Sequence, residues 1–158
     1  MRRIFLATLL SLTAVHGVAQ PLDQFRILNH LDNYGNLDLR NKPYSELPSG
    51  LVIKGNLNIA KTTIKKLPAG VEILGSLEAS NSELKSLGKG VSIKGYANLL
   101  GSKITRWPSK IKLGGYLNLT DTPLTFLPPR LRVKGDLSVI RTPLTALPEG
   151  LTVDGNLY

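Results

Sequence analysis

Hydrophobic positions recur at an interval of twenty residues along most of this chain. The most regular column holds leucine, or once tryptophan, and proline follows five of its members. That column is Leu47, Leu67, Leu87, Trp107, Leu127 and Leu147. A fixed period of this length is typical of a repeat protein in which each unit forms one turn of a stacked coil.

Within each unit, apolar residues occupy every second position, as in Leu51-x-Ile53-x-Gly55-x-Leu57-x-Ile59. This alternation predicts strands with one buried face. Glycine recurs without a break at the middle of the pattern, at Gly35, Gly55, Gly75, Gly95, Gly115, Gly135 and Gly155. Because glycine weakens a straight strand, the column indicates a bend, a positive φ, or a close approach of backbones between coils.

The predicted fold is an all-β solenoid of about six 20-residue coils, in which short parallel strands stack into a rod of roughly 30 Å. A column of small hydroxyl residues marks one corner of each coil, at Thr62, Ser82, Ser102, Thr122 and Thr142. Stacked on its copy in the next coil, such a side chain can satisfy backbone groups at an inward corner. An ordinary turn preference of serine and threonine is the alternative.

The two ends of the array differ in sequence. Residues 20–46 are expected to hold a cap and a degenerate first coil, with a short helix that starts at Asp23 and covers the stack with Phe25, Leu28 and Leu31. Residues 47–158 form the repeat solenoid, which stops in mid-repeat. We expect either that the open last coil pairs with another molecule, giving a homo-oligomer, or that the chain is part of a longer array.

The first nineteen residues have the layout of a secretory signal peptide. Basic Arg2 and Arg3 precede an uncharged apolar run at 4–15, and the small residues Gly17 and Ala19 suit cleavage after Ala19. A membrane anchor is the alternative. No later apolar segment is long enough to span a bilayer, so the processed protein is expected to be periplasmic or secreted, with no membrane span.

One segment resembles a known family. Leu117-x-Leu119-x-x-Thr122-x-Leu124-x-x-Leu127-Pro128 is similar to the L-x-L-x-x-N-x-L-x-x-L-P signature of leucine-rich repeats, above all the short bacterial class found in secreted effectors. The resemblance implies a curved stack that binds partners on its inner face. Two departures, hydroxyl residues in place of asparagine and a second short strand at Val-x-Gly-x-Leu, leave a straighter β-solenoid as the competing fold. The catalytic ligase-like domain of those effectors has no counterpart here.

The composition argues against catalysis. The chain has no cysteine, and His30 is the only histidine after the expected leader, which excludes thiol chemistry and makes a histidine-based nucleophile or metal site very unfavourable. Glu78 and Asp136 fall on one face but three coils apart, about 14 Å, which is too far for a paired acid and base. We therefore expect no enzyme activity, no metal and no cofactor, with a polysaccharide-active enzyme as the least favoured alternative.

Two outward stripes are candidate binding surfaces. The chain carries a net charge of +9, and basic residues that alternate with buried ones form a patch suited to phosphates or acidic sugars. The patch comprises Lys94, Lys110, Lys112, Arg130, Arg132 and Lys134. A solvated face whose lysines deter edge pairing is the alternative.

The second stripe follows the next strand of each coil and is suited to a glycan or a protein. It comprises Asn58, Tyr96, Asn98, Tyr116 and Asn118; asparagine as a filler of tight coils is the alternative. We interpret Trp107 as a core residue. The sequence thus predicts an exported, non-catalytic interaction module for a protein or anionic glycan. The alternative is a structural protein that stacks end to end; nucleic acid is not expected as a partner.

Overall fold

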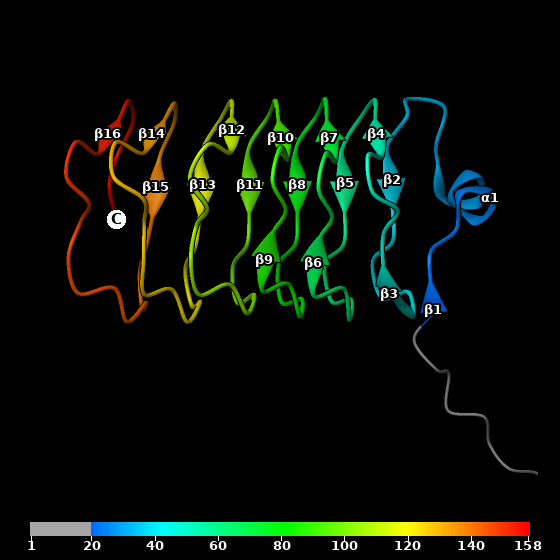
Figure 1. Cartoon of the computed structure of the whole chain (residues 1–158), viewed down its shortest axis with the longest axis horizontal. Coiled ribbons are helices and arrows are strands. Elements are labelled where there is room, and N and C mark those ends of the chain that lie inside the picture. Colours follow the sequence, from blue (N-terminus) through cyan, green and yellow to red (C-terminus); the bar gives the residue numbers. More distant parts are fainter. Residues whose placement is uncertain (1–19) are drawn as a thin grey trace, which may run out of the picture.

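The computed structural model describes residues 20–158, and the expected signal peptide lies outside them. These residues wind into a β-solenoid of about seven turns, stacked in a nearly straight line (Figure 1). Each regular turn contributes strands to three rows, which we name in chain order. The all-β solenoid predicted from the sequence is confirmed. The stack has one coil more than expected, because residues 37–38 already pair with the next coil.

The second row is the continuous one. It is a six-stranded parallel sheet in the order β15-β13-β11-β8-β5-β2, and Leu157 extends it through a single bridge to Leu137. Its strands are β2 (Leu37–Asp38), β5 (Leu57–Asn58), β8 (Leu77–Glu78), β11 (Ala97–Asn98), β13 (Leu117–Asn118) and β15 (Leu137–Ser138). Equivalent residues twenty apart face each other throughout, as Leu57 faces Leu77. Twenty residues therefore make one complete coil of the solenoid.

The first row is split into two sheets. Four strands pair in the order β12-β10-β7-β4, while β14 pairs only with β16. The strands are β4 (Val52–Ile53), β7 (Glu72–Ile73), β10 (Ser92–Ile93), β12 (Lys112–Leu113), β14 (Arg132–Val133) and β16 (Thr152–Val153). The break lies between β12 and β14, which stand further apart than the other neighbours of this row (Figure 1).

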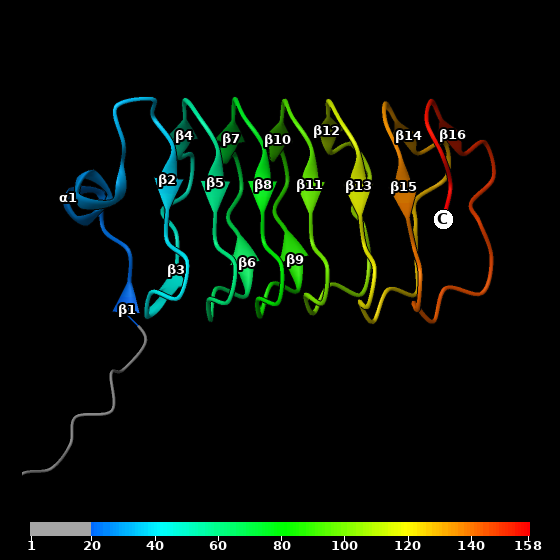
Figure 2. The same cartoon turned by 180° about the vertical axis from the view of Figure 1, so that it is seen from behind.

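The third row is the least regular. It contains β1 (Gln20–Pro21) paired with β3 (Tyr44–Glu46), and β6 (Lys66–Leu67) paired with β9 (Ser86–Leu87). Further along, Arg106 and Phe126 form an isolated parallel bridge. Seen from behind, the strands of this row end at β9 (Figure 2). The row is therefore also interrupted, one coil before the break in the first row.

The core is a single continuous interior that runs the length of the stack. Each coil contributes side chains from the same aliphatic columns, and most of them are fully buried. Burial stabilises each such side chain by about 1.5–3 kcal/mol. Trp107 is 1% exposed, which confirms its interpretation as a core residue.

The glycine column allows close approach of neighbouring backbones. The Gly75 N–H donates to the Gly55 carbonyl at 2.9 Å, and a Cβ atom at Gly75 would lie 2.7 Å from that carbonyl. Within this column only Gly35 has a positive φ, at 75°. Of the three explanations that the sequence left open, the bend and the close approach both hold for the repeating glycines, and positive φ holds only at Gly35.

The hydroxyl column satisfies backbone groups at the corner, but within its own coil. Thr62 Oγ1 donates to the Ile59 carbonyl at 2.7 Å and Ser82 Oγ to the Ala79 carbonyl at 2.6 Å. Each hydroxyl therefore satisfies the carbonyl three residues back in its own coil, and not a group of the neighbouring coil. Ser102 Oγ is buried without a partner among the described residues.

The N-terminal cap contains a one-turn helix, α1 (Gln24–Ile27), followed by a 3-10 turn, η1 (Leu28–His30). As predicted, Asp23 caps it, with its carboxylate accepting from the Arg26 N–H at 2.8 Å.

The expected apolar face of this cap is wrong: Phe25 is 85% and Leu28 68% exposed, and Leu31 also reaches solvent. Leu22 and Ile27 cover the first coil instead, because the pairing of β1 with β3 fixes the chain just before the helix. Among residues 20–158, no helix has the length and apolar character needed to cross a membrane.

Candidate functional site

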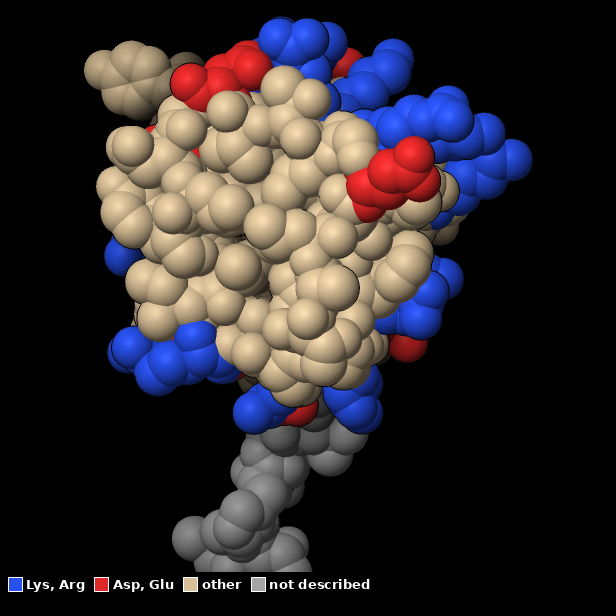
Figure 3. All heavy atoms as spheres, turned by 90° about the vertical axis from the view of Figure 1, so that its left-hand side faces the viewer, with Lys and Arg blue, Asp and Glu red and all other residues tan. Residues whose placement is uncertain are grey.

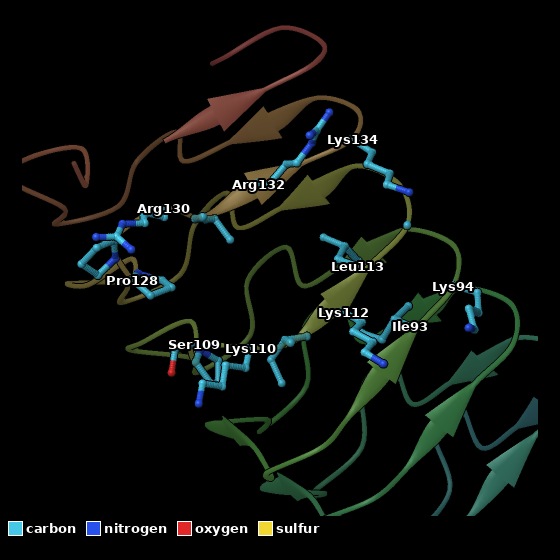
Figure 4. Close-up of a pocket in the computed structure, with 15 residues that line it drawn as sticks. Ile93, Lys94, Ser109, Lys110, Lys112, Leu113, Pro128, Arg130, Arg132 and Lys134 are labelled. Atoms are coloured by element: carbon cyan, nitrogen blue, oxygen red, sulfur yellow. The ribbon is translucent and has the colours of Figure 1, made fainter. Parts of the chain in front are cut away.

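A cavity of about 780 Å³ opens in the first row, between the coils that carry β12 and β14. All six basic residues singled out in the sequence line it (Figure 4): Lys94, Lys110, Lys112, Arg130, Arg132 and Lys134. We call this cavity the basic cleft. Lys94, Lys110 and Lys112 lie on one side of the opening, and Arg130, Arg132 and Lys134 on the other (Figure 4). The structure therefore brings the whole predicted patch together around one concave site.

The cleft exists because the backbone ladder of the first row stops there. In neighbouring coils the ladder is intact: the Lys94 N–H donates to the Ile73 carbonyl at 2.9 Å, and the Gly114 N–H to the Ile93 carbonyl at 3.0 Å. One coil later the equivalent bond would join the Lys134 N–H to the Leu113 carbonyl. Within the described part of the chain, no backbone hydrogen bond joins residues 109–115 to residues 129–135. Two strand edges therefore face the cleft.

The break reflects a tilt of one coil, residues 101–120, which we call the tilted coil. In the first row it pairs with the preceding coil through β10 and β12. In the third row it pairs with the following coil, where the Trp107 N–H donates to the Phe126 carbonyl at 3.1 Å. A second cavity, of about 560 Å³, lies on that side and is lined by Lys85, Arg106 and Trp107 among others. The coil thus leans towards a different neighbour on each side.

Two departures from the repeat explain the tilt. Trp107 occupies a column that holds leucine in the other coils, and the third-row ladder to the preceding coil is missing at this larger side chain. Gly114 stands where other coils carry a side chain, and a Cβ atom there would lie 1.8 Å from the Lys94 carbonyl oxygen. Only glycine allows this approach. The tilted coil therefore moves towards Lys94 in the first row and away from β14.

The opening also exposes part of the core. Ile111 and Leu113 are only partly buried, whereas Ile73 and Ile93 in the regular coils are buried. Both of these partly buried residues line the cavity. The basic cleft therefore has an apolar floor beneath its charged rim.

The rim is largely free of compensating acid. Arg132 is 3.2 Å from Asp154 through Nη2 and Oδ2. The other five basic residues make no ion pair with any residue between 20 and 158. Their positive charge is available to a ligand.

Two of the rim residues have an unfavourable backbone conformation. At one corner of each coil φ is positive, and four coils place glycine there: Gly50, Gly70, Gly90 and Gly150. The other two coils place Lys110 at φ 65° and Arg130 at φ 56°. A left-handed conformation costs an L-residue about 1–2 kcal/mol. Strained backbone is often retained at functional sites, but it is not confined to the cleft here. Another corner of the coils has positive φ at Asn41, Lys61, Asn81, Asp121 and Arg141.

The second predicted stripe has a mainly structural arrangement. Asn58, Asn98 and Asn118 are half-buried, and each amide oxygen accepts from the backbone N–H two residues later. Tyr96 and Tyr116 stack on each other, with ring centroids 4.4 Å apart and planes 6° apart. Burial raises the pKa of Tyr116, with smaller contributions from Tyr96 and Glu78. Only the tyrosine pair remains as a candidate contact surface in this stripe.

Sequence reasoning located the cations but missed the residues that open the cleft and form its floor. The signal was present in the repeat itself: Gly114, Trp107 and Lys110 each depart from their column.

Comparison with protein-family models, with curated proteins and with solved structures gives no match. No group of three or more potential metal-ligating side chains lies together within residues 20–158.

Proposed function

We propose that this protein is an exported, non-catalytic binding module whose basic cleft holds an anionic partner, either a protein or an acidic glycan. The observation that carries the proposal is that six cations from three successive coils surround one cavity. Anions are attracted most strongly where like charges line a concave surface with low-dielectric walls.

The cost of building the cleft supports a role in binding. Left-handed lysine and arginine, exposed core residues and unpaired strand edges all reduce the stability of the stack. All three occur together at the basic cleft, and the exposed floor and the unpaired edges are the features that support a site retained for its ligand. Positive φ alone does not, because Lys61 and Arg141 share it away from the cleft.

A binding role without catalysis also agrees with the positions of the histidine and the carboxylates. His30 lies in the N-terminal cap, where its Nε2 is 2.8 Å from the Tyr44 hydroxyl, and no carboxylate lines the basic cleft. The cavity thus has cations but no acid–base pair.

The resemblance to short bacterial leucine-rich repeats supports the same proposal, since that family consists of interaction domains. We place the chain as a β-solenoid relative of this class that is exported by its first nineteen residues. N-terminal sequencing of the protein recovered outside the cytoplasm tests export, with Gln20 expected as the first residue.

Charge reversal tests the binding proposal. The double variant Lys112→Glu with Arg132→Glu changes the charge at the rim by four units. At about 0.5 kcal/mol per unit, the affinity for polygalacturonate or polyglutamate should fall about thirty-fold. Isothermal titration at low salt is the measurement, because screening is weakest there.

The matched control is Lys54→Glu with Lys66→Glu, which makes the same change in net charge outside the cleft. This control should change the affinity for polygalacturonate or polyglutamate only slightly. Equal losses in the two double variants would show that net charge, and not the cleft, governs binding. Unchanged binding by the first variant would rule the cleft out.

End-to-end self-association is a second candidate. The C-terminal end of the stack is a broad uncharged face with basic and acidic residues around its rim (Figure 3), and Leu147 and Tyr158 there are 51% and 57% exposed. Exposed apolar side chains such as these favour association. Light scattering over a range of concentrations tests it, and a monomer at every concentration would count against it.

A further inference from the structure

We propose that the partner held in the basic cleft is an extended acidic segment of a polypeptide, which pairs with the free edges of β12 and β14 and completes the interrupted first row. The inference rests on the proposed function, since it requires that the cleft binds an anion. It adds the class of partner and the way in which that partner is held.

The free edges provide the first argument. In the regular coils, the Ser92 N–H donates to the Val71 carbonyl at 3.0 Å, and the equivalent groups at the cleft are the Arg132 N–H and the Ile111 carbonyl. These two groups face the break without bonding each other. An extended peptide carries alternating donors and acceptors at the spacing of a strand, so it can satisfy such edges. A polysaccharide has no such regular series of amide groups.

The side chains around the cleft specify the pattern of the peptide. Ile111 and Leu113 form an apolar floor, while Lys110 and Lys112 alternate with them and point outwards. Successive side chains of a strand point to opposite faces. A bound strand would therefore place one set of side chains on the floor and the other beside the cations. A segment that alternates apolar and acidic residues fits both surfaces.

The opening is confined to one side of the stack. In the second row the Leu117 N–H donates to the Asp136 carbonyl at 2.9 Å and the Leu119 N–H to the Ser138 carbonyl at 2.8 Å. These bonds hold the tilted coil to the next coil while the first row is open. Binding in the first row therefore leaves the second-row bonds in place. The cavity, at about 780 Å³, lies within the usual size range of ligand sites, about 300–1,000 Å³.

The charge around the edges also explains selectivity. Lysine on a strand edge deters pairing with neutral strands and with other copies of the chain, because its charge would have to be desolvated. The same lysines favour a strand that brings carboxylates. The basic rim therefore prevents unwanted pairing and selects the acidic partner.

The experiment compares four probes by isothermal titration against the purified protein. They are a capped peptide of alternating glutamate and valine, the same peptide N-methylated at alternate residues, a peptide of equal composition with all glutamates grouped at one end, and polygalacturonate. N-methylation preserves charge but removes hydrogen-bond donors. Loss of two such bonds should weaken binding at least about tenfold. The grouped peptide should also bind about tenfold more weakly than the alternating one.

Amide hydrogen exchange gives an independent measurement. Binding of the alternating peptide should slow exchange at Arg132 and Lys134, whose N–H groups face the cleft, and leave exchange at Lys94 unchanged because its N–H is already bonded. Equal affinity for the plain and N-methylated peptides, or no change at Arg132 and Lys134, overturns strand pairing.

The outcomes also separate this inference from the proposed function. Tight binding of polygalacturonate, with all three peptides bound equally, would keep an anion-binding cleft and reject the strand. No binding of any of the four probes at low salt would reject both.

Discussion

The regular coils of residues 61–100 and the tilted coil of residues 101–120 are built on the same columns, yet they differ in how they meet their neighbours. In the regular coils the first and second rows both pair with the next coil, and the aliphatic columns are buried. The tilted coil pairs with the next coil in the second row but not in the first. Cavities lie on both sides of it.

The difference shows how few changes convert a structural repeat into a site. Trp107 and Gly114 alter the packing of one coil, and the hydrogen bonds of the second row keep the stack intact around it. Each coil of a solenoid contacts mainly its neighbours, so a local tilt need not spread. A repeat can therefore specialise one junction while the others supply stability.

The sharpest test of this comparison removes the same column residue from each region. Ile73→Ala in a regular coil empties a fully buried position and should lower the free energy of unfolding by about 3–4 kcal/mol. Leu113→Ala, one column member at the cleft, should cost about 1–2 kcal/mol, because part of that side chain already contacts solvent. Urea unfolding followed by circular dichroism measures both.

Equal losses for the two variants would contradict the comparison, because they would mean that the cleft is closed in solution. Leu77→Ala provides a control from the second row, where the ladder is continuous and the residue is fully buried. Leu77→Ala should lower the free energy of unfolding by about as much as Ile73→Ala does.

Closing the cleft from the backbone side should have the next largest effect. Gly114→Lys restores the side chain type found at Lys94 and Lys134, and its Cβ atom cannot occupy the present position beside the Lys94 carbonyl. The coil must shift towards β14, at a cost of about 1–3 kcal/mol from overpacking. We expect the melting temperature and the affinity for polyglutamate to fall together, although the variant carries one more positive charge.

Gly115→Ala is the neighbouring control. A Cβ atom at Gly115 would lie 3.0 Å from the nearest backbone atom, so a small adjustment accommodates it and the cleft should stay open. Stronger polyglutamate binding by Gly114→Lys would show that charge alone decides the affinity.

Much of this fold can be predicted from the sequence because the same pattern of buried residues recurs in every coil of a solenoid. Leu57 and Leu77 occupy one column, so the register of the strands could be read from spacing alone. The tilt of one coil could not be predicted in this way, because it depends on how closely the backbone at one glycine approaches its neighbour. A periodic pattern of residues does not contain that distance. The direction of the cap was missed for a similar reason. Phe25 and Leu28 share a helical spacing, but the pairing of β1 fixes the orientation of the helix and turns Ile27 inwards instead.

The candidate site was predicted in part. Alternation with buried residues placed Lys112 and Arg132 on the outside of adjacent coils, and the structure has them there. The partly exposed floor at Leu113 was unforeseen, since an aliphatic column predicts burial in every coil. Departures from a column, rather than the column itself, were the signal for the cleft.

The strained corners offer a test in which stability and binding change in opposite directions. Lys110→Gly and Arg130→Gly restore the residue that the other coils use at this positive φ. Relief of strain, less the entropy lost by glycine, should raise stability by about 0.5–1 kcal/mol per site. Binding of polyglutamate should weaken, because two rim cations are lost.

The reverse change belongs in a regular coil. Gly70 has φ 72° and an added Cβ atom would meet nothing closer than 3.6 Å, so Gly70→Lys should be tolerated but cost about 1 kcal/mol. Thermal unfolding compares the three variants. A destabilised Lys110→Gly would show that its side chain supports the fold and would remove strain as an argument for the site.

The smallest expected effect concerns an ion pair on the coil that follows the tilted one and carries β14. Asp121 at the start of that coil bonds Arg141 of the last coil, and this contact lowers the pKa of Asp121 below its ordinary value of 3.8. A lowered pKa means that the folded state favours the charged carboxylate. The stabilisation is therefore present above the ordinary value and is lost as the pH falls through the lowered one.

Both side chains are exposed, so the effect on global stability should be slight. A local effect is expected instead. Asp121→Asn should speed amide exchange at residue 121, whose N–H donates to the Ile140 carbonyl at 3.0 Å, and the difference from the parent should vanish in acid. Asp38→Asn is the matched control, since the pKa of Asp38 is also lowered, by Arg40 within the same coil. If both variants changed exchange at residue 121 equally, the ion pair with Arg141 would not hold the β14 coil to the last one.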